Sequence, residues 1–141
     1  MLVLDASMAL AWCITRNDPS EAAIAQDALN FVRLNSAHVP ALWFAEVANA
    51  LLVFERAGRL SPEDSSHFLA DLDTLWTAED LVSAGRSRSK VLAAARKYHL
   101  TAYDATYLEF ALRQRAGLAT FDRKLAEAYR RAGGQVFGDQ P

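Results

Sequence analysis

Four acidic residues are the part of this sequence whose types and positions could do chemistry: Asp5, Glu46, Asp104 and Asp122. Asp5 directly follows an unbroken apolar run at residues 1–4, which is typical of a strand buried on both faces of a parallel sheet. In such sheets the ligand crevice lies beyond the carboxyl ends of the strands. Asp5 is therefore expected at the mouth of a site. Asp122 follows the strand-like residues 118–120 and is expected at the same edge.

Carboxylates that face one another repel and raise each other's pKa, and a divalent cation between them relieves this repulsion. Glu46 supports such a site, because it lies inside an apolar helix, where an ionised side chain is costly unless it is paired or metal-bound. Oxygen ligands favour Mg²⁺ or Mn²⁺ over zinc. We expect Asp104 and Glu46 in the first turns of helices that start from the same edge of the sheet or its rim.

Three of the acids also have a purely structural explanation. Asp5 and Asp122 could each cap the helix that follows them. Asp104 lies three residues after Thr101, which is the spacing of a capping box with aspartate in the acidic role. Glu46 is harder to explain as a cap, because it lies away from the strongest dipole effect of the first turn. On these residues alone, the capping and metal-binding interpretations both stay open.

The elements that must position the acids alternate between short strands and helices. Strands are expected at residues 2–4, 37–39, 79–82, 118–120 and 135–137. Helices are expected at residues 8–14, 20–34, 42–56, 62–76, 89–99, 101–116 and 122–131, with a loop at 83–87. Such alternation implies right-handed crossovers. The sequence predicts one α/β domain over residues 1–141, with three α/β/α layers and a central parallel sheet of about five short strands.

The composition is that of a folded globular domain. The 141 residues are 52% hydrophobic and 23% charged, which allows a sizeable core and argues against disorder. No apolar stretch approaches the ~20 residues of a membrane helix, and no basic region precedes the first apolar run. The one cysteine, Cys13, excludes an internal disulfide, and we expect a cytoplasmic protein. Glycine-rich phosphate loops, nucleophile elbows and paired-cysteine motifs are absent from the sequence.

The charges are unevenly distributed, although the net charge is only −2. Residues 1–85 hold 4 basic and 12 acidic side chains, whereas residues 86–141 hold 11 basic and 5 acidic ones. The second half is therefore compatible with a surface that faces nucleic acid, although a solvated helix surface can carry the same charges.

Helix 42–56 is the most apolar helix of the chain. Glu46 and Asn49 are three residues apart and share one face. A second, apolar stripe consists of Trp43, Val47, Leu51 and Phe54. This is more apolar surface than one buried face requires, so part of the helix is expected to meet a partner subunit.

Four segments resemble the PIN-domain ribonucleases, and most closely the VapC-type toxins of bacterial type II toxin–antitoxin modules. They are Leu-Asp-Ala-Ser at 4–7, Pro-Ala-Leu-Trp-Phe-Ala-Glu-Val-Ala-Asn-Ala-Leu at 40–51, Leu-Thr-Ala-Tyr-Asp-Ala at 100–105 and Leu-Ala-Thr-Phe-Asp-Arg-Lys-Leu at 118–125. Their order and spacing match the family over essentially the whole chain. The resemblance places the family's acidic quartet on Asp5, Glu46, Asp104 and Asp122. It places supporting positions on Ser7, Asn49 and Thr120.

The resemblance implies metal-dependent RNA cleavage with Mg²⁺ or Mn²⁺, a homodimer, and inhibition by a cognate antitoxin laid across the active-site groove. Asp5 and Asp104 would hold the principal ion, and Glu46 and Asp122 would complete the outer site. Ser7 and Thr120 would support these ligands by hydrogen bonds or contact the substrate. The candidates for steering the RNA backbone are Arg86, Arg88, Arg113, Arg115, Arg123 and Lys124.

Three other interpretations remain open at this point. The same acids could serve a structure-specific DNA nuclease. Alternatively, the chain could be a dimeric binding module whose acids merely cap helices, which predicts no dependence on Mg²⁺ or Mn²⁺. A phospho-accepting receiver domain fits less well, because its acids would be paired after the first strand, whereas here they are spread over four segments.

Overall fold

A computed structural model describes residues 1–75, 77–81 and 84–139, except for the side chains of Ala84 and Arg86. Its sheet contains four parallel strands: β1 (Leu2–Leu4), β2 (Ala37–Val39), β3 (Thr77–Glu79) and β4 (Gly117–Ala119). Their order across the sheet is β3-β2-β1-β4. The chain first builds outward from β1 through β2 to β3 and later adds β4 on the other side of β1. The topological switch point therefore lies between β1 and β4, where parallel sheets usually bind ligands.

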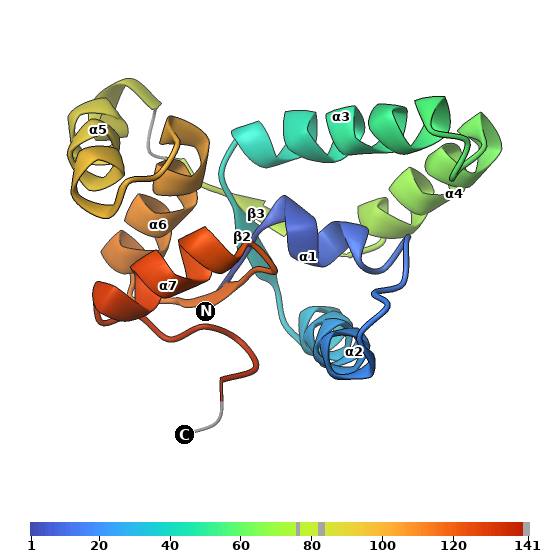
Figure 1. Ribbon diagram of the computed structural model, residues 1–141, viewed down its shortest axis with the longest axis horizontal. Coiled ribbons are helices and arrows are strands. Elements are labelled where there is room, and N and C mark those ends of the chain that lie inside the picture. Colours follow the sequence, from blue (N-terminus) through green and yellow to red (C-terminus); the bar gives the residue numbers. More distant parts are fainter. Residues whose placement is uncertain (76, 82–83, 140–141) are drawn as a thin grey trace.

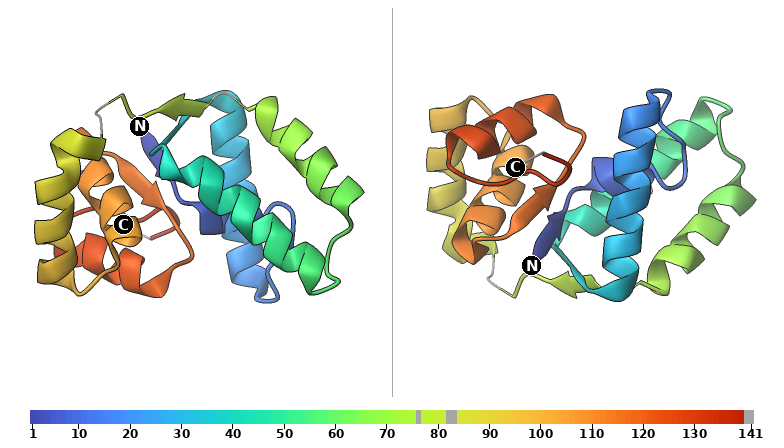
Figure 2. Two further views of the ribbon diagram at one scale, coloured as in Figure 1. Left: turned by 90° about the horizontal axis from the view of Figure 1, so that it is seen from above. Right: turned by 90° about the horizontal axis from the view of Figure 1, so that it is seen from below.

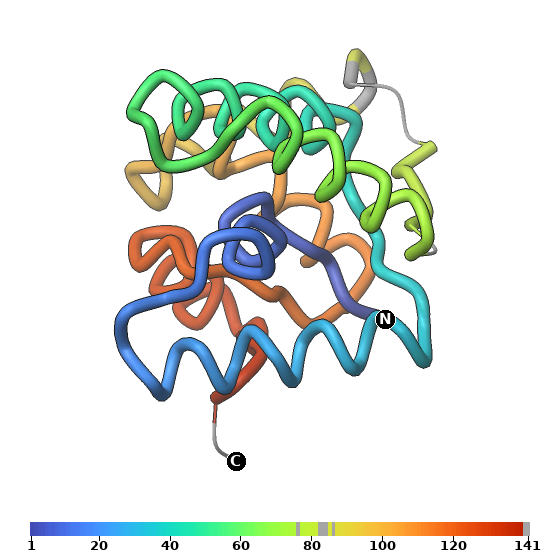
Figure 3. Tube along the Cα trace, turned by 90° about the vertical axis from the view of Figure 1, so that its right-hand side faces the viewer, coloured from blue at the N-terminus to red at the C-terminus, as the bar shows by residue number. Residues whose placement is uncertain are grey.

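The described residues form seven helices, and these flank the sheet in two groups. They are α1 (Ala6–Leu10), α2 (Pro19–Leu34), α3 (Leu42–Arg56), α4 (Pro62–Asp73), α5 (Ala84–Tyr98), α6 (Ala102–Gln114) and α7 (Arg123–Arg131). Helices α5 to α7 lie on one side of the strands and α1 to α4 on the other (Figures 1 and 2). The short helix α1 lies between α2 and α3 (Figure 3). The predicted α/β/α architecture is thereby confirmed.

The core lies where both helix groups meet the sheet. All three residues of β1 are buried, as expected for an apolar run that is covered on both faces. Met8 contributes from one helix group, whereas Tyr107 and Leu125 contribute from the other. None of the described helices is long and apolar enough to cross a membrane.

The predicted stripe on α3 is buried within this chain. Trp43, Val47 and Leu51 belong to the core, and only Phe54 is half-buried. The surplus apolar surface that we expected on this helix does exist, but it lies on another face and includes Leu52 and Val53.

Several helix boundaries differ from the predicted ones, although α3 spans the predicted 42–56. The first helix, expected at 8–14, is the shorter Ala6–Leu10. Helix α2, expected from residue 20, begins at Pro19 because Asp18 is its cap: the Asp18 side chain accepts a hydrogen bond from the Ser20 N–H at 2.8 Å.

Two further helices end or begin elsewhere than predicted. Helix α4 ends at Asp73 rather than 76, and residue 76 lies outside the described residues. Helix α6 ends at Gln114 because Arg115 adopts a left-handed conformation with φ 50°, and Gly117, the expected stop, already belongs to β4.

The prediction of a fifth strand at residues 135–137 is wrong. Only Val136 forms an isolated bridge to Leu118, and Gly138 then turns the chain with φ 90°. The strand expected at 79–82 lies earlier, as β3, and residue 82 is outside the described residues. The expected loop at 83–87 is largely replaced by the first turn of α5, and residue 83 is also outside them.

Candidate active site

Asp5 follows β1 at the carboxyl edge of the sheet, where the sequence predicted it. Its backbone N–H bonds to the Ala119 carbonyl of β4 at 3.0 Å, so the residue is held across the switch point. The buried carboxylate accepts hydrogen bonds from Thr120 Oγ1 at 2.7 Å and from Ser7 Oγ. Asp5 occupies the N-cap position of α1, but its side chain makes no capping bond. The capping explanation therefore fails for Asp5.

Ser7 and Thr120 form a clamp around Asp5. Ser7 Oγ accepts a hydrogen bond from the Phe121 N–H at 2.9 Å, and Thr120 Oγ1 accepts one from the Asp122 N–H at 3.0 Å. Each hydroxyl oxygen is thus engaged by a backbone donor while its own proton points to Asp5 Oδ2. The clamp fixes the orientation of this carboxylate and favours its ionised form, against the effect of burial.

Glu46 is half-buried and lies opposite α6, one turn into α3. It is the fifth residue of the helix, so our placement of it in the first turn was wrong. The fully buried Tyr107 of α6 donates its hydroxyl hydrogen bond to Glu46 Oε2. Tyr107 was not predicted from the sequence, because an aromatic residue in an apolar helix is expected to belong to the hydrophobic core. The available signal was its spacing, three residues after Asp104 and hence on the same helical face.

Asp104 and Asp122 begin their helices as expected. Asp104 lies in the first turn of α6, and its backbone N–H donates to Thr101 Oγ1 at 3.1 Å. Asp122 caps α7 by accepting a hydrogen bond from the Leu125 N–H at 2.8 Å. The capping explanation is therefore correct for Asp122. It does not exclude a second role, because a carboxylate has two oxygens and several acceptor positions.

Electrostatic interactions link the four acids. Burial raises the pKa of Asp5, and the charge of Asp104 adds to this effect. Burial likewise raises the pKa of Glu46, with contributions from Asp5 and Asp104. The pKa of Asp104 is raised by burial and by Asp122, while Lys124 opposes the change. Side chains that are distant in sequence thus share one electrostatic environment at the carboxyl edge of the sheet.

The donor set matches a hard divalent cation, because the four acids offer only oxygen atoms. Among the residues that the structure describes, no group of three or more histidine, cysteine or acidic side chains could hold an ion as they stand. The carboxylates are turned toward other partners, which are the clamp for Asp5, Tyr107 for Glu46 and the α7 backbone for Asp122.

The remaining site candidates lie at different distances from this edge. Asn49 is exposed on α3. Arg123 and Lys124 are exposed at the start of α7, directly after Asp122. Arg115 is exposed beyond the far end of α6, next to β4's first residue, so the structure does not bring it to the acids.

Arg113 is occupied by ion pairs. It pairs with Asp80 and with Glu109, the latter at 3.0 Å, and its guanidinium lies 5.1 Å from the centre of the Phe110 ring. This arrangement gives Arg113 a structural role between α6 and the chain after β3. Arg88 is exposed on α5, and the side chain of Arg86 lies outside the described residues.

Lowering the pH from 7 to about 4 is expected to stabilise this site in the metal-free chain. Raised pKa values at Asp5, Glu46 and Asp104 mean that the folded chain binds protons more tightly than the unfolded chain does. Their contribution to stability is fully present below the ordinary carboxyl pKa of about 4 and is lost as the pH rises through the raised values. Thermal unfolding in EDTA at several pH values measures this effect.

The control for this experiment is the Glu46→Gln variant, which has one fewer coupled carboxyl group and should gain less on acidification. Asp27→Asn, at an exposed position on α2, should behave like the unchanged chain. Identical pH dependence of all three proteins would contradict the electrostatic coupling of the site.

The chain has the fold and the sequence pattern of a known family of α/β domains. The chain belongs to the PIN domain family, whose model matches residues 2–131. Among proteins of known function, it is 32% identical over 130 residues to ribonuclease VapC3 of Pyrobaculum aerophilum, covering 91% of this chain and 94% of that protein.

Two solved structures share the fold. PAE2754 from Pyrobaculum aerophilum superimposes with a TM-score of 0.70 at 23% identity and covers 96% of this chain and 87% of its own. FitAcB from Neisseria gonorrhoeae superimposes with a TM-score of 0.63 at 14% identity, over 97% of this chain and 96% of its own. At these identities the likeness establishes the fold alone.

Proposed function

We propose that this chain is a VapC-type toxin, a cytoplasmic endoribonuclease that depends on Mg²⁺ or Mn²⁺ and is inhibited by a cognate antitoxin. The observation that carries the proposal is the buried Asp5, held by two hydroxyls at the switch point and electrostatically coupled to Glu46 and Asp104. The near full-length similarity to ribonuclease VapC3 supports the assignment.

The proposed reaction is the hydrolysis of an RNA phosphodiester bond. Asp5 and Asp104 would hold the principal ion, with Glu46 and Asp122 completing the outer site; when bound, such an ion lowers the pKa of water and neutralises charge on the phosphate. Ser7 and Thr120 orient Asp5 and favour its ionised form, against the effect of burial. Tyr107 fixes one oxygen of Glu46 so that the other can orient the attacking water in line with the leaving oxygen.

The test is cleavage of total RNA by the purified chain with Mg²⁺, with Mn²⁺ and with EDTA, followed by mapping of the cut ends. We expect discrete cuts that EDTA abolishes. A matched single-stranded and a branched DNA substrate test the rival DNA nuclease, which would cleave DNA in preference to RNA. If the chain cleaves neither RNA nor DNA, and if Mg²⁺ and Mn²⁺ do not change its melting temperature, it is instead a binding module.

We further propose that the chain forms a homodimer through the outer face of α3. Two large apolar side chains on the face opposite the buried stripe remain substantially exposed in the single chain: Leu52 at 45% and Val53 at 50%. Burying them against the same surface of a second copy would remove an apolar patch from water, in the two-fold manner usual for homodimers.

The Val53→Lys variant is expected to shift the chain toward monomer, because a twofold contact would place two buried ammonium groups near each other. Sedimentation velocity over a concentration series measures the change, and circular dichroism checks the fold. Ala23→Lys, at an exposed position on α2, is the matched control and should leave the association unchanged. Unaltered association of Val53→Lys would place the dimer contact elsewhere.

A further inference from the structure

A cavity of about 600 Å³ opens directly beside the acidic site, on the side of Ser7. We call it the arginine pocket and define it by three cationic and three apolar lining residues: Arg16, Arg59, Arg123, Leu10, Ile14 and Phe54. The apolar members come from α1, the turn that follows it, and α3. This volume is in the usual range for small-molecule sites and accommodates one nucleotide.

The three arginines reach the pocket from separate parts of the chain. Arg16 follows α1, and Arg123 is the first residue of α7. Arg59 comes directly after Gly58, whose φ of 71° ends α3 and turns the chain back over the helix. The Arg59 guanidinium consequently lies 5.2 Å from the centre of the Phe54 ring.

The charges in the pocket are only partly neutralised. Arg16 pairs with Glu21 at 2.8 Å and stacks over the Phe121 ring at 4.7 Å. The other acid that lines the cavity, Asp18, is engaged in capping α2. Within the described part of the chain, neither Arg59 nor Arg123 forms an ion pair. Two cations without acidic partners at one cavity favour the binding of an anion.

The pocket also has the surfaces that an unstacked base requires. Single-stranded nucleic acid is bound by stacking of its bases on aromatic side chains or guanidinium planes, combined with cations that track the backbone. Phe54 and the guanidinium above it supply such a surface. Ser7 connects the cavity to the acids, because its hydroxyl lines the pocket and holds Asp5.

We propose that the arginine pocket binds one nucleotide of a single-stranded RNA next to the bond that is cleaved. The base lies against the apolar lining, and the phosphate is held by Arg59 and Arg123. This inference rests on the proposed ribonuclease function and adds to it the position of one nucleotide subsite, beside the acids on the side of α1 and the end of α3.

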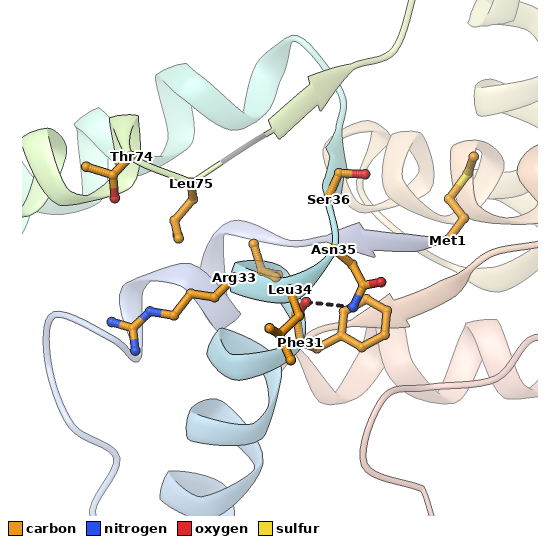
Figure 4. Close-up of a pocket in the computed structure, with 9 residues that line it drawn as sticks. Met1, Phe31, Arg33, Leu34, Asn35, Ser36, Thr74 and Leu75 are labelled. Atoms are coloured by element: carbon orange, nitrogen blue, oxygen red, sulfur yellow. Dashed lines mark hydrogen bonds between the residues drawn. The ribbon is translucent and has the colours of Figure 1, made fainter.

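A second cavity of about the same volume provides the contrast. It is lined by residues around the end of α2 and by Met1, so it lies toward the amino end of β1, opposite the edge that carries Asp5 (Figure 4). Its one arginine, Arg33, is exposed. Because this cavity has no acids of the site beside it, Arg33 serves as the matched control.

The experiment measures binding of a fluorescent single-stranded RNA oligonucleotide to the Asp104→Asn protein in EDTA, so that no cleavage occurs. The further change Arg59→Ala is expected to weaken binding roughly tenfold, the loss of one charge-assisted phosphate contact. The slope of log Kobs against log salt should fall by about 0.7. Arg33→Ala should change neither quantity. In the otherwise unchanged enzyme, Arg59→Ala should raise KM and leave kcat unchanged. This is the result expected when a contact stabilises the bound substrate and the transition state equally.

The proposal would be overturned if Arg59→Ala and Arg33→Ala weakened RNA binding equally, because positive charge would then act nonspecifically. It would also be overturned if Arg59→Ala had no effect on binding. A loss of kcat at unchanged KM would also overturn it, by placing Arg59 in the chemistry. Binding is measured here without ion or cleavage. Failure of the pocket can therefore be distinguished from failure of the ribonuclease assignment, which the Mg²⁺-dependent cleavage of total RNA tests by itself.

Discussion

Replacing Asp104 by asparagine is expected to abolish RNA cleavage while leaving the fold intact. Asp104 lies in the first turn of α6 and is coupled to Asp5, Glu46 and Asp122, so its charge lies at the centre of the acidic site. Asparagine keeps the shape and the backbone bond to Thr101 but contributes no negative charge toward a cation. We expect a loss of roughly a thousandfold in cleavage rate, the upper end of the range for removing one electrostatic contact from an active site.

The same change should stabilise the chain when no ion is present. Burial and the charge of Asp122 raise the pKa of Asp104, which means that its ionised form is less stable in the folded chain than in the unfolded chain. Removing that charge relieves the repulsion. The melting temperature in EDTA should rise by a few degrees, since about 1 kcal/mol corresponds to roughly 2–4 °C in a domain of this size. In saturating Mn²⁺ the unchanged chain should instead have the higher melting temperature of the two proteins.

Asp27→Asn is the control for both measurements, because it removes an acid from an exposed position on α2. It should cleave RNA and melt like the unchanged chain. If Asp104→Asn retains nuclease activity, Asp104 has no part in the chemistry. If it loses activity and stability together, Asp104 is a structural residue, and the acidic site must be reinterpreted.

Replacing Tyr107 by phenylalanine is expected to lower the cleavage rate by about 10–100-fold, the usual effect of removing a group that orients a metal ligand. The buried Tyr107 hydroxyl is the donor that holds Glu46 Oε2. Phenylalanine preserves the packing of the ring in the core but leaves this carboxylate free to rotate. Mn²⁺ titration by calorimetry should show weaker binding to the variant, which is a readout independent of turnover.

Tyr103→Phe, on the same helix but 66% exposed, is the matched control and should change neither cleavage nor ion binding. A purely structural role for Tyr107 predicts a different pattern, with a lower melting temperature and unchanged ion affinity. That pattern would remove Tyr107 from the functional site.

The positions of the acids could be predicted where strand ends determine them. The apolar run before Asp5 and the shorter run before Asp122 led to the same sheet edge, and the β1–β4 pairing confirms that placement. Glu46 stood out because an acid inside an apolar helix needs a partner. That partner, Tyr107, could not be identified from the sequence, because packing between α3 and α6 decides which buried ring meets the carboxylate.

The errors have physical causes of the same kind. The strand expected at 135–137 fails because a single bridge to Leu118 is followed at once by the turn at Gly138. Arg113 stays a predicted RNA contact, but its long-range pairing with Asp80 was not predicted from the sequence. Local composition does not show that a turn will end strand pairing. It also does not show which residue, 33 positions away, will form an ion pair.

The clamp around Asp5 has a consequence for the order in which the protein becomes competent during synthesis. Ser7 is synthesised 113 residues before Thr120, yet both must be present to orient one carboxylate. A nascent chain that has not yet paired β4 with β1 lacks half of this arrangement. The complete clamp therefore forms only after β4 has been synthesised and has paired with β1.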